Sequence, residues 1–144
     1  MVQTDYLIIA DTATAAEGKL YIHGAGWDSL FVPSFPAQHP ILGIATRLRV
    51  PWEETNQPHN VEVDVVSEVG DSILPEPLGS LRGTIFLGQP AHLPPGSDQA
   101  LVLAFNITNL QFENPGTYSA VLRIDGRDSA TLRFNVTLIP GIPE

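Results

Sequence analysis

The last third of the chain carries the feature that most constrains its fold. Asn114, Gly116 and Tyr118 stand at alternate positions, and two alternating segments follow, separated by Asp125 and Gly126. An asparagine or aspartate, a glycine and a tyrosine at this spacing mark a corner of a β-sandwich, where the tyrosine hydroxyl binds nearby backbone. The pattern therefore predicts such a corner at Tyr118 and a closing β-hairpin after it.

Ala120 stands where extracellular domains with this corner carry a cysteine, and the chain has no cysteine. Because no disulfide can join the sheets, packing between them must supply the cohesion. We expect Ala120, Leu122 and Phe134 in that core. The missing cysteine favours an intracellular domain.

Apolar residues alternate with polar ones in further segments, between turns rich in the chain's thirteen prolines and twelve glycines. These predicted strands cover 5–13, 19–31, 41–50, 61–65, 81–87 and 100–108. The first two should pair through a turn at 16–19. With the closing hairpin there are about eight strands and no helix, which predicts an all-β fold: an immunoglobulin-like, two-sheet antiparallel β-sandwich. A chain of this length is expected to form a single domain, 1–144.

The closing hairpin has a parity constraint. Leu122 and Leu132 are both even-numbered and both expected to point into the core. The residue numbers of two facing residues in this hairpin must therefore add up to an even number. An odd-length loop or a bulge near 125–128 would place Leu122 opposite Leu132 and Ala120 opposite Phe134. We predict the odd-length loop.

Two strands carry charges on their polar faces. Arg47 and Arg49 alternate with apolar residues in one strand, and Glu62 and Asp64 alternate with valines in another. If these strands pair, the four side chains face one another and help to set the register, each pair contributing about 0.2–1 kcal/mol.

The charge balance excludes some partners. The chain has 16 acidic and 7 basic side chains, a net charge of −9, which repels a phosphate backbone. No basic segment precedes the short apolar stretch 6–10, and no apolar run is long enough to cross a bilayer. We therefore expect a cytoplasmic protein that binds neither nucleic acid nor membrane.

No segment indicates catalysis. Gly24 and Gly26 lack the third glycine of a dinucleotide loop, since Ser29 stands there, and are better explained as bulge glycines before a packed Trp27. No serine has the context of a nucleophile, and the carboxylates show no pairing signal. We predict no catalytic residue, no cofactor and no metal ligand set, and hence a protein that is not an enzyme. The sequons at Asn106 and Asn135 should be inert and face outward.

One loop rim is the candidate ligand site. If each strand crosses its sheet once, loops 51–59 and 89–98 share an end with 13–18 and 125–128. The rim would then gather an aromatic ring, two carboxylates and two imidazoles: Trp52, Glu53, Glu54, His59 and His92. Such groups bind a glycan or a metal ion. The alternative, which we favour, is a solvated acidic loop with Trp52 capping the core.

Two motifs resemble a known family. The chain reads GKLYIHGAGWD at 18–28, and PGTY, DG and FNV follow at 115–118, 125–126 and 134–136. In these motifs it resembles a family of uncharacterised bacterial proteins, small β-sandwiches carried under a domain-of-unknown-function label. The resemblance implies no activity and no site residues.

Several apolar residues fall on nominally outer faces or edges: Leu30, Phe31, Val66, Phe86, Val102 and Val121. They indicate either an interface or packing beneath the long loops 33–40, 69–79 and 89–98. The leading hypothesis is a non-enzymatic protein–protein interaction or structural module of a bacterial assembly, which uses a sheet face or edge to bind a protein partner or to self-associate. The alternative is a small-ligand module that uses the rim.

Overall fold

The computed structural model describes residues 1–75 and 81–140, and this part of the chain is all-β, as predicted. Its ten strands are β1 (Gln3–Ala10), β2 (Thr12–Ala16), β3 (Lys19–His23), β4 (Ser29–Val32), β5 (Ala37–Val50), β6 (Pro58–Val66), β7 (Leu81–Phe86), β8 (Gln99–Phe112), β9 (Gly116–Ile124) and β10 (Arg127–Leu138). Within the described residues the only helix is one 3-10 turn, Trp52–Glu54, so no helix there is long enough to cross a membrane.

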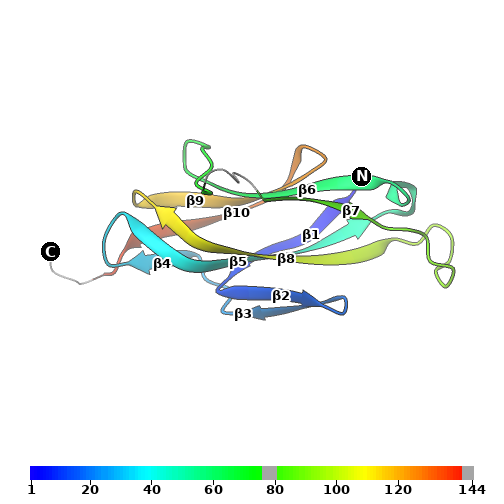
Figure 1. Cartoon of the computed structure of the whole chain (residues 1–144), viewed down its shortest axis with the longest axis horizontal. Coiled ribbons are helices and arrows are strands. Elements are labelled where there is room, and N and C mark those ends of the chain that lie inside the picture. Colours follow the sequence, from blue (N-terminus) through cyan, green and yellow to red (C-terminus); the bar gives the residue numbers. More distant parts are fainter. Residues whose placement is uncertain (76–80, 141–144) are drawn as a thin grey trace.

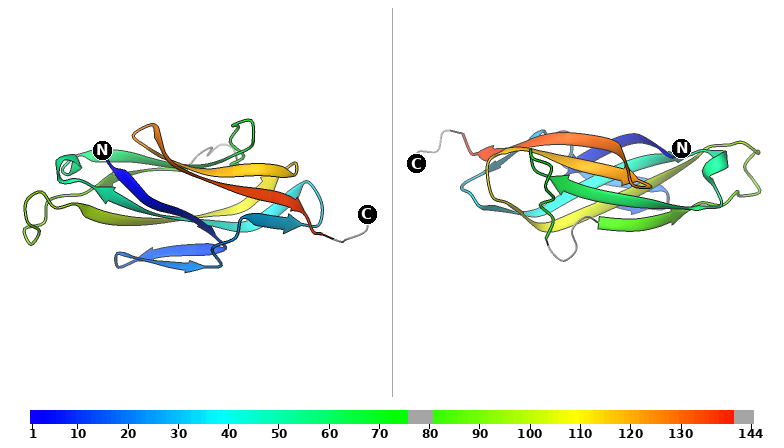
Figure 2. Two further views of the ribbon diagram at one scale, coloured as in Figure 1. Left: turned by 180° about the vertical axis from the view of Figure 1, so that it is seen from behind. Right: turned by 90° about the horizontal axis from the view of Figure 1, so that it is seen from above.

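The strands form three sheets. A five-stranded sheet in the order β4-β10-β9-β6-β7 lies over a three-stranded sheet, β1-β5-β8, and the hairpin β2-β3 makes a third layer (Figure 1). All pairs are antiparallel except β4 with β10, which is parallel. Figure 2 shows the same layers from behind and from above. The expected count of eight strands in two antiparallel sheets is therefore wrong for the described part of the chain.

The two extra strands arise near the N-terminus. The predicted strand 5–13 divides at Asp11 into β1, which pairs with β5, and β2, which pairs with β3. The predicted strand 19–31 divides at Gly24 and Gly26, whose φ angles of 70° and 95° bend the chain away from β3. The two glycines form a bend between strands rather than the predicted bulge. Trp27 follows the bend, and its indole N–H donates to the Gly24 carbonyl over 2.8 Å.

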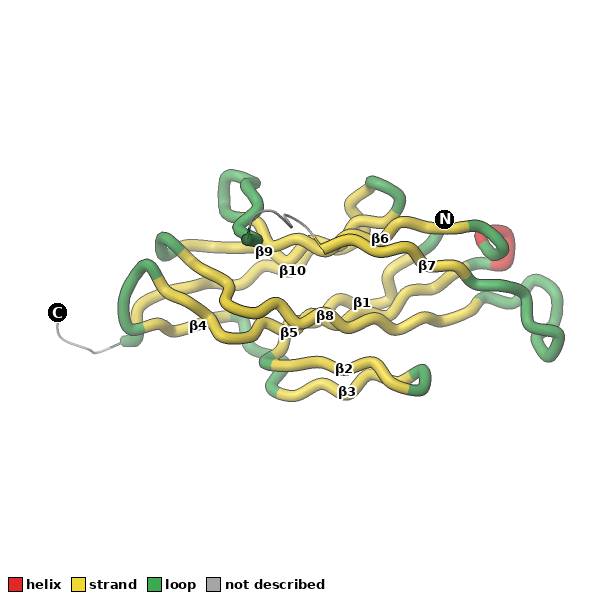
Figure 3. Tube along the Cα trace, viewed as in Figure 1, coloured by secondary structure: helices red, strands yellow, loops and turns green. Residues whose placement is uncertain are grey.

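The β2-β3 hairpin lies across the outer face of the three-stranded sheet (Figure 3). It can approach closely because Gly43 of β5 has no side chain beneath Thr12. The Asn106 amide of β8 donates to the Ala13 carbonyl over 2.7 Å, and its oxygen accepts from the Ala13 N–H over 3.0 Å. One side chain therefore satisfies both backbone groups of Ala13 and fixes the hairpin to the sheet.

The core lies between the two larger sheets, where the predicted alternation of β5 places Leu42, Ile44 and Leu48 in full burial. One end of this core is aromatic: the rings of Phe112 and Tyr118 meet edge to face at 4.8 Å. Further edge contacts join Phe134 to Phe112 and to Trp27. The Tyr118 hydroxyl donates to the Asn114 carbonyl over 2.6 Å, which confirms the predicted corner.

The closing hairpin corrects the predicted loop. Asp125 and Gly126 form a two-residue turn with φ angles of 53° and 79°, the geometry that matches the twist of the flanking strands. A bulge between Asp128 and Ala130 then restores the parity that the core requires. The predicted alternative of a bulge is therefore confirmed. The predicted facing pairs are wrong by two residues, because Leu122 faces Ala130 and Ala120 faces Leu132.

The charge ladder also differs from expectation, because β5 and β6 belong to different sheets. Arg47 and Arg49 instead bind Asp5, which sits in a bulge of β1. Arg123 of β9 binds Glu62 at 2.8 Å and Asp64 at 3.5 Å. Both sets of charged residues form ion pairs, but each set pairs within its own sheet.

Gly43→Ala should loosen the hairpin. The added Cβ would lie 2.9 Å from the Thr12 backbone, closer than van der Waals contact allows. We expect the free energy of unfolding to fall by about 1–3 kcal/mol, with faster amide exchange confined to residues 12–23. Gly83→Ala is the matched control, since nothing lies within 4 Å of its new Cβ. Equal effects of the two substitutions in urea melts would contradict this account of the hairpin.

Candidate functional site

The loops of the predicted rim do meet at one end of the molecule. The Asn56 N–H donates to the Leu87 carbonyl over 2.7 Å, and the Gln89 amide donates to the Thr55 hydroxyl over 2.8 Å. These bonds join loop 51–57 to loop 87–98.

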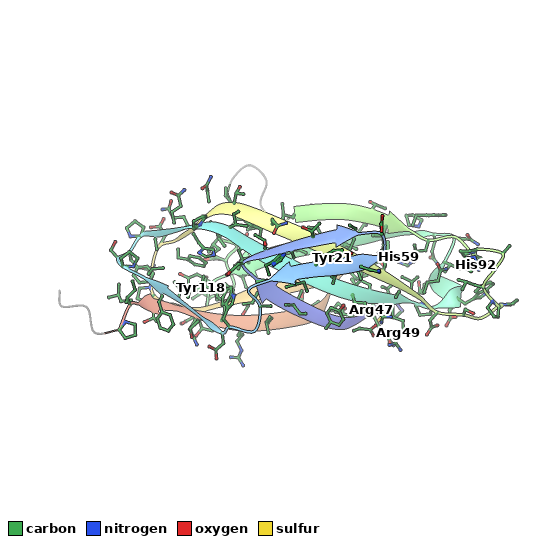
Figure 4. All side chains as sticks on the ribbon, turned by 90° about the horizontal axis from the view of Figure 1, so that it is seen from below. Tyr21, Arg47, Arg49, His59, His92 and Tyr118 are labelled. Atoms are coloured by element: carbon green, nitrogen blue, oxygen red, sulfur yellow. The ribbon has the colours of Figure 1, made fainter. Side chains whose placement is uncertain are left out.

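The rim residues themselves are divided. Trp52 and Glu54 are half-buried in the 3-10 turn, while Glu53 and His92 are exposed. His59 is only 4 % exposed, and Figure 4 shows it well separated from His92. Across the described residues no group of three histidine, aspartate or glutamate side chains gathers as a metal site would require. Of the five predicted residues, the structure brings Glu54 and His59 together.

His59 is held on both sides of its ring. Nδ1 lies 2.8 Å from Asp125 Oδ2, and Nε2 lies 2.7 Å from the Glu54 carbonyl oxygen. A carboxylate and a carbonyl oxygen only accept hydrogen bonds, so both ring nitrogens of His59 must donate, which requires the imidazolium form. Asp125 also accepts from the Asn60 N–H over 2.9 Å. The pair thereby joins the 3-10 turn, β6 and the closing turn.

Two opposed effects act on the pKa of His59. Burial lowers it, but the hydrogen bonds to Asp125 and to the Glu54 carbonyl, with the nearby carboxylates, outweigh burial and raise it. The hydrogen bond from His59 holds the pKa of Asp125 below its ordinary value. Because both nitrogens of His59 are committed inside the fold, the pair acts as a structural clamp and has no free nitrogen for proton transfer.

A cleft of about 610 Å³ opens beside this clamp. Its walls include Thr4, Glu54, Asp125, Arg127, Asp128 and Ser129, and the Thr4 and Ser129 hydroxyl oxygens lie 2.6 Å apart. Its lining mixes charged and hydroxyl groups with apolar side chains, including Val2 and Ile124. Sequence reasoning missed the cleft because strand periodicity does not indicate which edges of two sheets approach each other.

The six predicted interface residues do not form one patch. Phe31 and Phe86 are 55 % and 60 % exposed, but they lie on β4 and β7, the opposite edges of the five-stranded sheet. Val66 and Val121 are buried, and Leu30 and Val102 are half-buried. Packing within the chain therefore accounts for part of the set, including Val66, whose backbone bridges to Ser72.

Strand β8 has an open edge, which no single residue of the sequence indicates. Among the described strands it pairs only with β5, so its other side is a sheet edge. Its fourteen residues include no charged side chain and no proline. Residues 101–105 are all apolar and all partly exposed. The sequence signal was present: a charge-free segment in a chain with 16 acidic and 7 basic residues.

The family model for a "Family of unknown function (DUF6941)" matches residues 5–137, and the chain belongs to that family. No curated protein sequence matches the chain. Among solved structures, the Pseudomonas fluorescens alkylpurine DNA glycosylase AlkC, bound to DNA containing an abasic site analog, aligns with a TM-score of 0.42 and 9 % identity. The alignment covers 94 % of this chain but only 30 % of the glycosylase.

The clamp should make stability depend on pH. Because the pKa of His59 is raised by folding, its contribution is complete below the unfolded value, about 6.5, and is lost as pH rises through the folded pKa. The lowered pKa of Asp125 means that its contribution is lost as pH falls from about 4 through its folded value. Urea melts should therefore show stability declining as pH rises above about 6.5.

Asp125→Asn should remove most of that decline, and asparagine tolerates the positive φ at this turn position. His92→Gln, which changes an exposed histidine, should keep it. The same slope of stability against pH in Asp125→Asn and in the native chain would show that the clamp has no such role.

Proposed function

We propose that this member of the DUF6941 family is a non-enzymatic protein-interaction module, an immunoglobulin-like sandwich that acts through the unpaired edge of β8. The single observation that carries the proposal is the state of that edge. An edge strand presents a row of free N–H and C=O groups on which another chain can pair.

The other three edges of the two larger sheets each carry a protective device of the kind that prevents such pairing. Strand β1 has the Asp5 bulge, β7 is short and carries the charged Arg82, and β4 is four residues long and is followed by Pro33. Strand β8 has none of these. Its pairs with β5 keep one register throughout, without a bulge, and the one interruption is at Asn109, which has a φ of 54° and no partner in β5.

The chemistry of the described side chains supports a binding role over catalysis. The buried histidine of the rim has both nitrogens hydrogen-bonded, which leaves it without a role in proton transfer. The cytoplasmic location and the membership of a bacterial assembly stay predictions from the sequence.

The 610 Å³ cleft favours a second candidate function, binding of a small polar ligand such as a glycan, beside Glu54 rather than around His92. A saturable rise in melting temperature with a sugar, lost in Asp128→Ala, would favour this candidate. The absence of any shift at millimolar sugar would count against it.

Photo-crosslinking in cells that naturally make the chain tests the edge proposal. A benzophenone amino acid in place of Ala100, an exposed residue of β8, should give a covalent adduct with another polypeptide. The matched position is Thr131, exposed on β10, which should give none. Failure to form an adduct at position 100, or equal yields at both positions, would refute a role for the β8 edge in protein binding.

A further inference from the structure

We infer that the occupant of the β8 edge is a second copy of this chain, paired antiparallel through β8 about a twofold axis. The inference rests on the proposed function and names its partner. It joins the two three-stranded sheets into one continuous sheet, β1-β5-β8-β8-β5-β1, and removes both free edges of β8 together.

Charge supports a second copy at this place. Two chains of net charge −9 repel each other, and contact is least unfavourable where neither brings a carboxylate to the interface. From Gly83 to Phe112, a stretch that includes most of β7 and all of β8, the sequence has one charged residue, Asp98. The uncharged edge of a strongly acidic chain is thus the surface on which two copies can approach.

The sequence of β8 also complements itself. Antiparallel pairing must keep inward residues opposite inward residues, so the numbers of facing residues add up to an even number. With Leu103 opposite its own counterpart, Leu101 faces Phe105, and the apolar run 101–105 pairs with itself from end to end. Leu101, Leu103 and Phe105 all have the inward parity of β8, and all three are only partly buried in the single chain. A second copy would complete their burial.

A basic partner is the competing occupant, and salt distinguishes the two. Salt screens the repulsion between two acidic chains, so added salt should strengthen self-association through an apolar edge. Added salt would weaken the attraction between this chain and a basic protein.

Sedimentation of the purified chain tests the inference. We expect a mass of twice 15.6 kDa at micromolar to millimolar protein concentration. The dimer fraction should be larger in about 0.5 M than in about 0.02 M sodium chloride, because the higher salt concentration screens the repulsion between the two acidic chains. A single-chain mass throughout that range would overturn the inference.

Charge exchange at Val102 then locates the contact. In the proposed register the two copies of this side chain lie diagonally across the twofold axis, about 7–8 Å apart. Val102→Glu lies opposite Arg47 within its own sheet, so the substituted chain should still fold. Val102→Glu and Val102→Arg should each sediment as single chains, and an equal mixture should recover the doubled mass.

Thr131→Glu is the matched control and should dimerise like the native chain. If Val102→Glu has a lowered melting temperature, Ala100→Glu, at an exposed position of β8, takes its place. Dimers that persist in the β8 variants, or a mixture that stays monomeric, would place self-association elsewhere and overturn the inference. The proposal that the β8 edge binds protein is tested separately, and it is overturned if position 100 forms no adduct with any polypeptide in cells. An adduct with a different protein, beside a monomeric purified chain, would overturn only the second copy.

Discussion

The aromatic contact of Phe112, Tyr118 and Phe134 is the interaction on which the rest of the structure depends. It joins the end of β8 in one layer to β9 and β10 in the other, and the Tyr118 hydroxyl fixes the connecting corner to Asn114. Trp27 packs on the same cluster and so directs the chain from the third layer into β4. The same β8 whose end carries Phe112 is the last strand of its sheet and pairs with β5 alone among the described strands.

The local parts of this arrangement were predictable from the sequence. The spacing around Tyr118 located the corner, and alternation identified the buried face of β5. The long-range parts were not, because they depend on which strands meet. The parallel pairing of β4 with β10 and the clamp between His59 and Asp125, 66 positions apart, leave no periodic signal. Asn106, read as an outward sequon, fastens a hairpin whose position only the assembled sheet reveals.

The position of β8 at the edge of its sheet supports the proposed function. In the described residues, three of the four edges of the two larger sheets carry a bulge, a charge or a proline. The β2-β3 hairpin covers the outer face of the three-stranded sheet but leaves the hydrogen-bonding side of β8 unpaired. A long, uncharged edge on an acidic chain is explained when that edge pairs with another strand, and self-pairing brings no carboxylate to the contact.

Amide hydrogen exchange as a function of protein concentration tests this claim most directly, because it reads the free side of β8 itself. In about 0.5 M salt, which screens the repulsion between acidic chains, peptides within Gln99–Phe112 should gain protection as protein concentration rises. Peptides from β1, whose edge carries the Asp5 bulge, should not change. Exchange in β8 that is equally fast at every concentration would contradict the account.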